Sequence, residues 1–229
     1  MPQPEFTSAP ERRELVAALI WLPVHVVLLP ALLGKLLEAG YITALSANLL
    51  CYGLGALYMT VFMFRFLRRD FDPLCDRPVY IIIQVAGSYV AMLFFNAAVS
   101  TVLLLAVGEM NPNNTAVIGL ADENSGVVTA MAVFLAPITE ECLFRGAVFN
   151  PLRTRSRALA YAVSILLFSV YHVWRYASAD PVYWLYAIQY IPVSWLLCRC
   201  YEQTNSIWTP IFFHMLTNGI SLKIAEELL

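Results

Sequence analysis

The amino-acid sequence predicts an all-α protein, a polytopic transmembrane helix bundle of about seven spans. Of its 229 residues, 60% are hydrophobic and only 13% are charged, and the mean hydropathy is +0.67. Such a chain belongs in lipid, where only helices and closed barrels satisfy every backbone polar group. The sequence lacks the alternating ten-residue segments of a membrane barrel, so we expect helices.

The expected spans are apolar runs separated by short polar or basic segments. They cover residues 15–34, 44–64, 79–107, 127–150, 158–174, 182–198 and 207–222. The last three are at or below the usual lower length limit for a spanning helix. The first run follows two arginines, as in a signal peptide, but no small-residue cleavage site is apparent. We therefore expect an uncleaved first span.

The distribution of Lys and Arg along the chain predicts the orientation of the bundle. With a cytoplasmic N-terminus, the inner side carries ten basic residues and the outer side carries three. The inner ones are Arg12, Arg13, Arg65, Arg68, Arg69, Arg77, Arg153, Arg155, Arg157 and Arg199, and the outer ones are Lys35, Arg175 and Lys223. This asymmetry follows the positive-inside rule.

The chain divides into three parts within a single membrane domain. We expect a cytoplasmic N-terminal tail at 1–14, N-terminal transmembrane helices and a polar outer loop at 15–126, and a transmembrane core at 127–229. The net charge of −2 argues against a nucleic-acid partner, which would favour a basic surface. The five cysteines show neither zinc-ligand spacing nor a redox motif.

The run 127–150 contains three ionisable side chains that a purely structural span does not need. Glu140, Glu141 and Arg145 would each oppose insertion by roughly 2.5–3.5 kcal/mol at a helix centre. Glu141 and Arg145 are four residues apart and can pair on one helical face. Glu140 points about 100° away and has no obvious local partner. Pro137, one turn earlier, should disturb the helix beside this acid.

Two of the three histidines stand in paired patterns on other spans. Phe168 and His172 are four residues apart, as are His214 and Asn218. A single buried histidine is usually structural. Polar groups at membrane depth on three spans should, however, converge inside the bundle, where they are not exposed to lipid. His25 has no polar company, and we interpret it as structural.

These three motifs, in this order and in separate spans, resemble those of the CAAX protease and bacteriocin-processing family of intramembrane glutamate endopeptidases. That family includes the Ras-converting CAAX prenyl protease. The resemblance covers about 127–222 and implies a four-helix catalytic core. It also implies a protein or peptide substrate, either prenylated or carrying a sorting tail that is removed.

The resemblance, read with the chemistry of the side chains, implies roles for the motif residues. Glu140 would take a proton from a water molecule with the help of His172, and the hydroxide would attack the scissile carbonyl. His214 and Asn218 would face the oxyanion. The supporting residues would be Glu141, Arg145 and Phe168, the first two as an ion pair and Phe168 as part of the pocket wall.

Several alternatives remain open at this point. Two histidines and one glutamate also match a catalytic zinc ligand set, although the close HExxH-type pair is absent; we expect no cofactor. A proton-coupled transporter would favour inverted repeats, which we do not find. A non-catalytic scaffold or immunity-type protein could keep the same core for binding. The compact chain without an organelle signal favours a bacterial-type plasma membrane.

Overall fold

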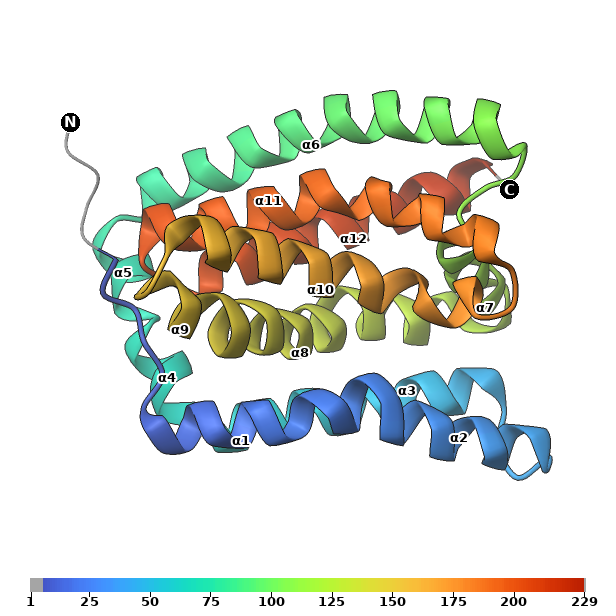
Figure 1. The fold of residues 1–229 in the computed structure, drawn as a ribbon, viewed down its shortest axis with the longest axis horizontal. Helices are drawn as coiled ribbons and strands as arrows, with labels where there is room; N and C mark the ends of the chain where they lie inside the picture. Colours follow the sequence, from blue (N-terminus) through green and yellow to red (C-terminus); the bar gives the residue numbers. More distant parts are fainter. Residues whose placement is uncertain (1–5, 229) are drawn as a thin grey trace.

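The computed structural model describes residues 6–228, and these residues form helices and turns without any strand. The helices run back and forth between two ends of an elongated bundle (Figure 1). In order they are α1 (Arg12–Pro23), η1 (Val24–Leu28), α2 (Leu29–Glu38), α3 (Ala44–Phe62), α4 (Phe64–Arg69), α5 (Asp72–Asp76), α6 (Pro78–Val107), α7 (Pro112–Ala130), η2 (Met131–Leu135), α8 (Ala136–Glu141), η3 (Cys142–Phe149), α9 (Asn150–Arg153), α10 (Arg157–Ala177), η4 (Pro181–Tyr186), α11 (Ala187–Thr204) and α12 (Trp208–Leu228).

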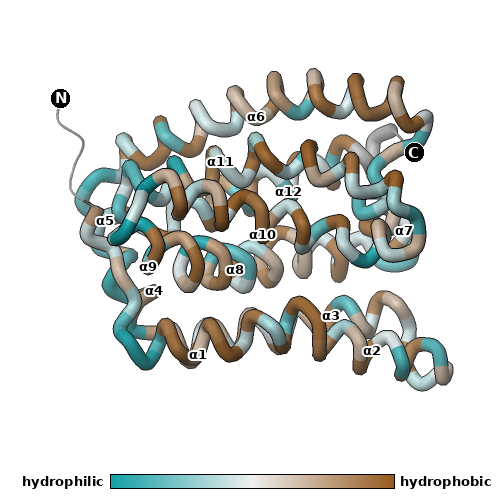
Figure 2. Tube along the Cα trace, in the orientation of Figure 1, coloured by the Kyte–Doolittle hydropathy of each residue, from teal (hydrophilic) through white to brown (hydrophobic). Residues whose placement is uncertain are grey.

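The outer helices are built to face lipid. α6 lies along one edge of the bundle, where it packs on α11 and α12 (Figure 1). Its large apolar side chains point outward; Leu105 is 82% exposed and Phe94 is 75% exposed. Hydrophobic residues likewise follow α1 along the opposite edge (Figure 2). This all-α architecture confirms the predicted fold class and an integral membrane location.

Within the described residues, five helical stretches are long and apolar enough to cross a membrane: Arg12–Glu38, Ala44–Phe62, Pro78–Val107, Pro112–Arg153 and Arg157–Ala177. α11 and α12 fall outside this set, although they run parallel to the others (Figure 1). Both lie against other helices of the bundle and carry buried polar residues such as Ser194 and His214. The expected number of about seven spans stays a prediction.

The polar outer loop expected between the spans 79–107 and 127–150 is instead mostly helical. α7 begins at Pro112, where the Asn111 side chain accepts a hydrogen bond from the Asn113 backbone N–H, a normal N-terminal cap. Asn124 interrupts the helix with non-helical backbone angles and caps the following turn by accepting from the Val127 N–H. Asn111 and Asn124 thus contribute to the polar composition of this segment as helix caps.

The N-terminal stretch 1–14, which we expect to form a tail, packs against the bundle over its described residues. The first helix begins at Arg12, and the segment before it is packed into the bundle. Phe6 contacts the rings of Phe149 and Tyr201, and Ser8 is buried. Residues 1–5 of the expected tail lie outside the described residues.

A buried polar network fixes this segment at the arginine-rich end of the bundle. Asp70, at the C-terminus of α4, accepts hydrogen bonds through Oδ2 from Ser8 Oγ (2.6 Å) and from the Ile207 N–H (3.1 Å). Tyr201 joins Ser8 Oγ (2.6 Å) and accepts from Asn150 Nδ2 (2.8 Å). One carboxyl group thus connects the N-terminal segment, α4 and the start of α12.

Burial of Asp70 makes the stability of the protein depend on pH. Desolvation raises the pKa of Asp70 to about 6, against the hydrogen bonds from Ser8 and Ile207 that favour its ionised form. The folded state therefore holds this proton more tightly than the unfolded state does. The stabilisation is complete below about pH 4, the usual pKa of an aspartate, and is lost as the pH rises through about 6.

We therefore expect the wild type to lose stability relative to Asp70→Asn between pH 4 and 6.5. Asparagine keeps an acceptor oxygen for both hydrogen bonds but does not titrate. Thermal unfolding of both proteins in detergent across this range is the measurement. A constant difference between their melting temperatures would contradict the role of Asp70.

Candidate active site

The acidic motif lies at the centre of one long helical stretch, Pro112–Arg153, in which two wide π-helical segments flank it. η2 ends directly before α8, and the Ala136 N–H donates to the Met131 carbonyl five residues back. Pro137 follows at the start of α8, where its missing N–H is tolerated in this transition. Such π segments are frequent at functional sites because they turn side chains away from the regular helical register.

A glycine lets α3 approach this motif closely. A Cβ on Gly55 would lie 2.7 Å from Thr139 Cγ2 and 3.2 Å from His25 Cε1, so neither neighbour leaves room for a larger residue. This contact brings Tyr52, one turn earlier on α3, next to the Glu140 carboxyl, with which it interacts. The close packing therefore places a phenol beside the acid.

Glu140 and the two motif histidines converge, as the sequence predicts for polar groups at membrane depth. Glu140 Oε2 lies 3.6 Å from His172 Nε2 and 3.9 Å from His214 Nε2. These separations are too long for direct hydrogen bonds. Glu140 Oε2 is buried and accepts no hydrogen bond from the described residues. Three polar atoms from three helices thus face one small space.

The orientation of each histidine is fixed through its other nitrogen. His172 Nδ1 lies 2.8 Å from the Phe168 carbonyl, which can only accept, so this nitrogen carries the hydrogen. His214 Nδ1 lies 2.8 Å from Glu141 Oε1. In the neutral form of either ring, Nε2 is then an acceptor that points toward Glu140.

The His172 ring is also held by aromatic stacking. It stacks on Tyr190 of α11 with ring centroids 4.3 Å apart and contacts Phe168 on its own helix. The Tyr190 hydroxyl accepts hydrogen bonds from Asn111 (3.1 Å) and Asn113 (3.2 Å). Asn111 and Asn113, at the start of α7, therefore support His172 indirectly, through Tyr190.

The expected ion pair between Glu141 and Arg145 is present, with Arg145 Nη1 3.2 Å from Glu141 Oε1 and both side chains fully buried. Arg145 has further partners that the sequence did not indicate. Its Nη2 donates to Ser194 Oγ (2.9 Å), and its guanidinium carbon lies 4.4 Å from the Phe168 ring centre. Glu141 Oε1 is shared between Arg145 and His214, so the pair is not self-contained.

Asn218 is placed differently from the other motif residues. Its Nδ2 donates to the Ala132 carbonyl (2.8 Å) in η2. The amide carries a second N–H, which this bond leaves unused. Asn218 thus links α12 to the π segment that precedes the acidic motif.

A second polar chain, made of residues outside the three motifs, reaches the same place. Tyr171 donates to the Tyr52 hydroxyl (3.1 Å) and lies 3.3 Å from His25 Nε2. His25 is fully buried in the π-helical segment η1, which follows Pro23. Tyr52 and Tyr171 carried no signal in the sequence, because a tyrosine within an apolar span is usually an interfacial or packing residue.

Comparison with known proteins finds a match over the part of the chain that carries the three motifs. Residues 123–220 match the family model described as type II CAAX prenyl endopeptidase Rce1-like. No curated protein and no solved structure matches the chain. The matched segment includes all three motifs from Glu140 to Asn218 and supports CAAX-type protease activity in a membrane. Over this segment, the chain is similar to the Rce1-like family of type II CAAX prenyl endopeptidases.

Proposed function

We propose that this protein is an intramembrane glutamate endopeptidase that hydrolyses a peptide bond near the terminus of a membrane-associated protein or peptide. The observation that carries the proposal is the buried Glu140 Oε2, which faces the Nε2 atoms of His172 and His214 without a protein donor of its own. A water molecule beside these atoms would find acceptors for both of its hydrogens.

In the proposed first step, Glu140 removes a proton from this water while His172 orients it. The resulting hydroxide attacks the scissile carbonyl carbon, and the carbonyl oxygen becomes an oxyanion. Collapse of this intermediate breaks the C–N bond, and the proton taken up by Glu140 passes to the leaving amine. General acid–base assistance of this kind contributes about 10²- to 10⁴-fold in rate.

His214 would stabilise the oxyanion as an imidazolium. Its Nδ1–H is directed to Glu141, so Nε2 becomes a donor only when the ring is doubly protonated. The Glu141 carboxylate, 2.8 Å from Nδ1, would offset that charge, since Glu140 is protonated at this stage. Asn218 would add its unused amide N–H as a second donor. Donors of this type contribute roughly 10²- to 10³-fold each.

We expect Glu140→Gln to lower proteolysis by about 10²- to 10⁴-fold or more while the protein still inserts and folds, because glutamine keeps the shape but cannot take the proton. His172→Ala should be similarly severe. Mass spectrometry of peptides released from membranes that contain each variant is the measurement. Glu123→Gln, an exposed acid earlier on the same helical stretch, is the matched control. Near-normal turnover by purified Glu140→Gln protein would disprove the glutamate mechanism.

Glu140 Oε2 and the Nε2 atoms of His172 and His214 would be the ligands of a zinc ion in the alternative mechanism. We propose the metal-free version, because the chain has no close ligand pair on one helix and the Glu140–His214 separation is 3.9 Å. We therefore expect full activity after exhaustive chelation and no stoichiometric zinc in elemental analysis. Activity that is lost with the chelator and restored by zinc would instead make Glu140, His172 and His214 metal ligands.

Arg145 would support the site without contacting the substrate. Removing either member of its buried pair with Glu141 leaves an uncompensated charge, a loss typically of about 3–5 kcal/mol. The double variant Glu141→Gln/Arg145→Met should therefore lose much less stability than the sum of the two single changes. The double variant should still lose activity, because His214 Nδ1 no longer faces the Glu141 carboxylate.

A double-mutant cycle on thermal unfolding, with turnover measured on the same samples, tests both statements. Additive stability losses would show that the two residues are not energetic partners. Full activity in the double variant would show that His214 does not depend on Glu141.

A further inference from the structure

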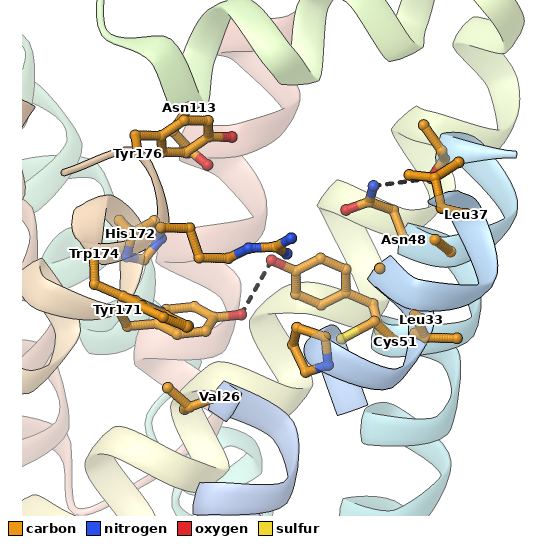
Figure 3. Close-up of a pocket in the computed structure, with 16 residues that line it drawn as sticks. Val26, Leu33, Leu37, Asn48, Cys51, Asn113, Tyr171, His172, Trp174 and Tyr176 are labelled. Atoms are coloured by element: carbon orange, nitrogen blue, oxygen red, sulfur yellow. Dashed lines mark hydrogen bonds between the residues drawn. The ribbon is translucent and has the colours of Figure 1, made fainter. Parts of the chain in front are cut away.

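A cavity of about 170 Å³ reaches the candidate active site from one end of the bundle. Side chains of α10, including Tyr171, His172 and Tyr176, face side chains of α2 and α3 across it (Figure 3). Its inner part is lined by Tyr52 and His172, the two residues that flank Glu140. The cavity therefore adjoins the candidate active site, with His172 in its wall.

The outer part of the cavity lies at the arginine-poor end of the bundle. It is lined there by the last turns of α2 and α10 and the first turn of α3, with Leu37, Ala44 and Arg175 among the lining residues. The opposite end holds α4, α5 and the turn between α9 and α10, where most of the arginines lie (Figure 1). By the positive-inside rule, the cavity is at the extracytoplasmic face.

The chemistry of the lining suits a mostly apolar segment that carries one negative charge. Val26, Pro30 and Leu33 form an apolar wall, and Arg175 is the cation. Among the side chains of residues 6–224, which the structure describes, no carboxylate lies in ion-pair distance of Arg175. Its guanidinium can therefore bind a carboxylate from outside the chain. The planar guanidinium group favours two parallel N–H···O hydrogen bonds to such a carboxylate.

We propose that this cavity is a substrate subsite that is filled from the extracytoplasmic face, with Arg175 binding a carboxylate of the substrate. The inference rests on the proposed function, because the subsite is placed relative to the proposed catalytic residues. Arg175 is three residues beyond His172 on α10, about 4.5 Å of helical rise. The bound carboxylate thus lies within a few peptide residues of the bond that is cut, and belongs to either a chain terminus or an acidic side chain.

Equilibrium binding of peptide probes tests the role of Arg175 without relying on turnover. The probes are a dansyl-labelled hexapeptide of Ala and Leu with a free C-terminal carboxylate, its C-terminal amide, and an amide with one internal Glu. All are measured in the Glu140→Gln background. We expect one of the two carboxylate probes to bind about 10- to 100-fold more tightly than the uncharged amide, and the preferred probe identifies the source of the carboxylate.

Arg175→Gln should remove this preference and leave binding of the uncharged amide unchanged, and Arg175→Lys should restore part of it. Lys35→Gln, which removes a positive charge at the same end of the bundle but does not line the cavity, should keep the preference. Equal binding of all probes, no binding of any probe, or an equal effect of Arg175→Gln on all of them would overturn the proposal. These outcomes are distinct from a failure of Glu140 to support proteolysis.

Thiol labelling tests the side of access. Gly34 lines the cavity, and a Cβ there would meet no atom within 4 Å, so Gly34→Cys introduces a probe without a clash. Cys75, exposed in α5 at the arginine-rich end, is a natural reference for the other face. In a Cys51→Ala background, a membrane-impermeant maleimide should reach Gly34→Cys and Cys75 from opposite faces of sealed vesicles. Labelling of both from one face would refute extracytoplasmic access.

Discussion

The complete burial of Arg145 is the constraint on which the core of this structure depends. A guanidinium at membrane depth is costly unless hydrogen bonds and an opposite charge compensate it. Here the compensation comes from three other places: Glu141 one turn earlier, Ser194 on α11 and the Phe168 ring on α10. Satisfying this one charge therefore fixes how α10 and α11 pack on the helix that carries the acidic motif.

The contacts that compensate the Arg145 charge also position the proposed catalytic residues. Glu141 is held by Arg145 and in turn fixes the His214 ring, so α12 is drawn into the same charge network. Phe168 contacts both the Arg145 guanidinium and the His172 ring. Glu140 Oε2, like Glu141 Oε2 and Arg145 Nε, has no hydrogen-bond partner among the described residues, and it faces the Nε2 atoms of His172 and His214. In the proposed mechanism, this oxygen is available for a water molecule.

Much of this arrangement could be predicted from the sequence, because a charge in an apolar run must be compensated inside the bundle. The helical class, the pairing of Glu141 with Arg145 and the convergence of His172 and His214 on Glu140 all follow from that requirement. The sharing of Glu141 by Arg145 and His214 could not be predicted, since it depends on the rotation of α12 against η3. Ser194 and Tyr52 were missed for a related reason, because a lone polar residue in an apolar span has many possible partners.

The two corrections to the fold concern segments that their polar composition assigned to a loop and a tail. Asn111 and Asn124 are helix caps, and Ser8 enters a buried network. Polar residues beside an apolar span can satisfy helix ends or buried groups as readily as they can face water. Composition alone does not distinguish a polar residue that caps a helix from one that faces water. An Asn directly before a proline, as at 111–112, is a local signal that a helix begins there.

The two ends of the bundle are built for different tasks. At the arginine-rich end, Asp70 connects the N-terminal segment to α4 and α12, and Glu202 binds Arg153 (2.5 Å), Arg157 (2.8 Å) and the Tyr161 hydroxyl (2.9 Å) across α9, α10 and α11. These contacts would have to break before the helices could separate there. At the other end, α2, α3 and α10 enclose the cavity, and the hydrogen bond from Tyr171 to Tyr52 joins α10 to α3 beside it. In the proposed mechanism, a substrate would enter at the cavity end, while the Glu141–Arg145 pair in the middle of the bundle holds His214 beside Glu140.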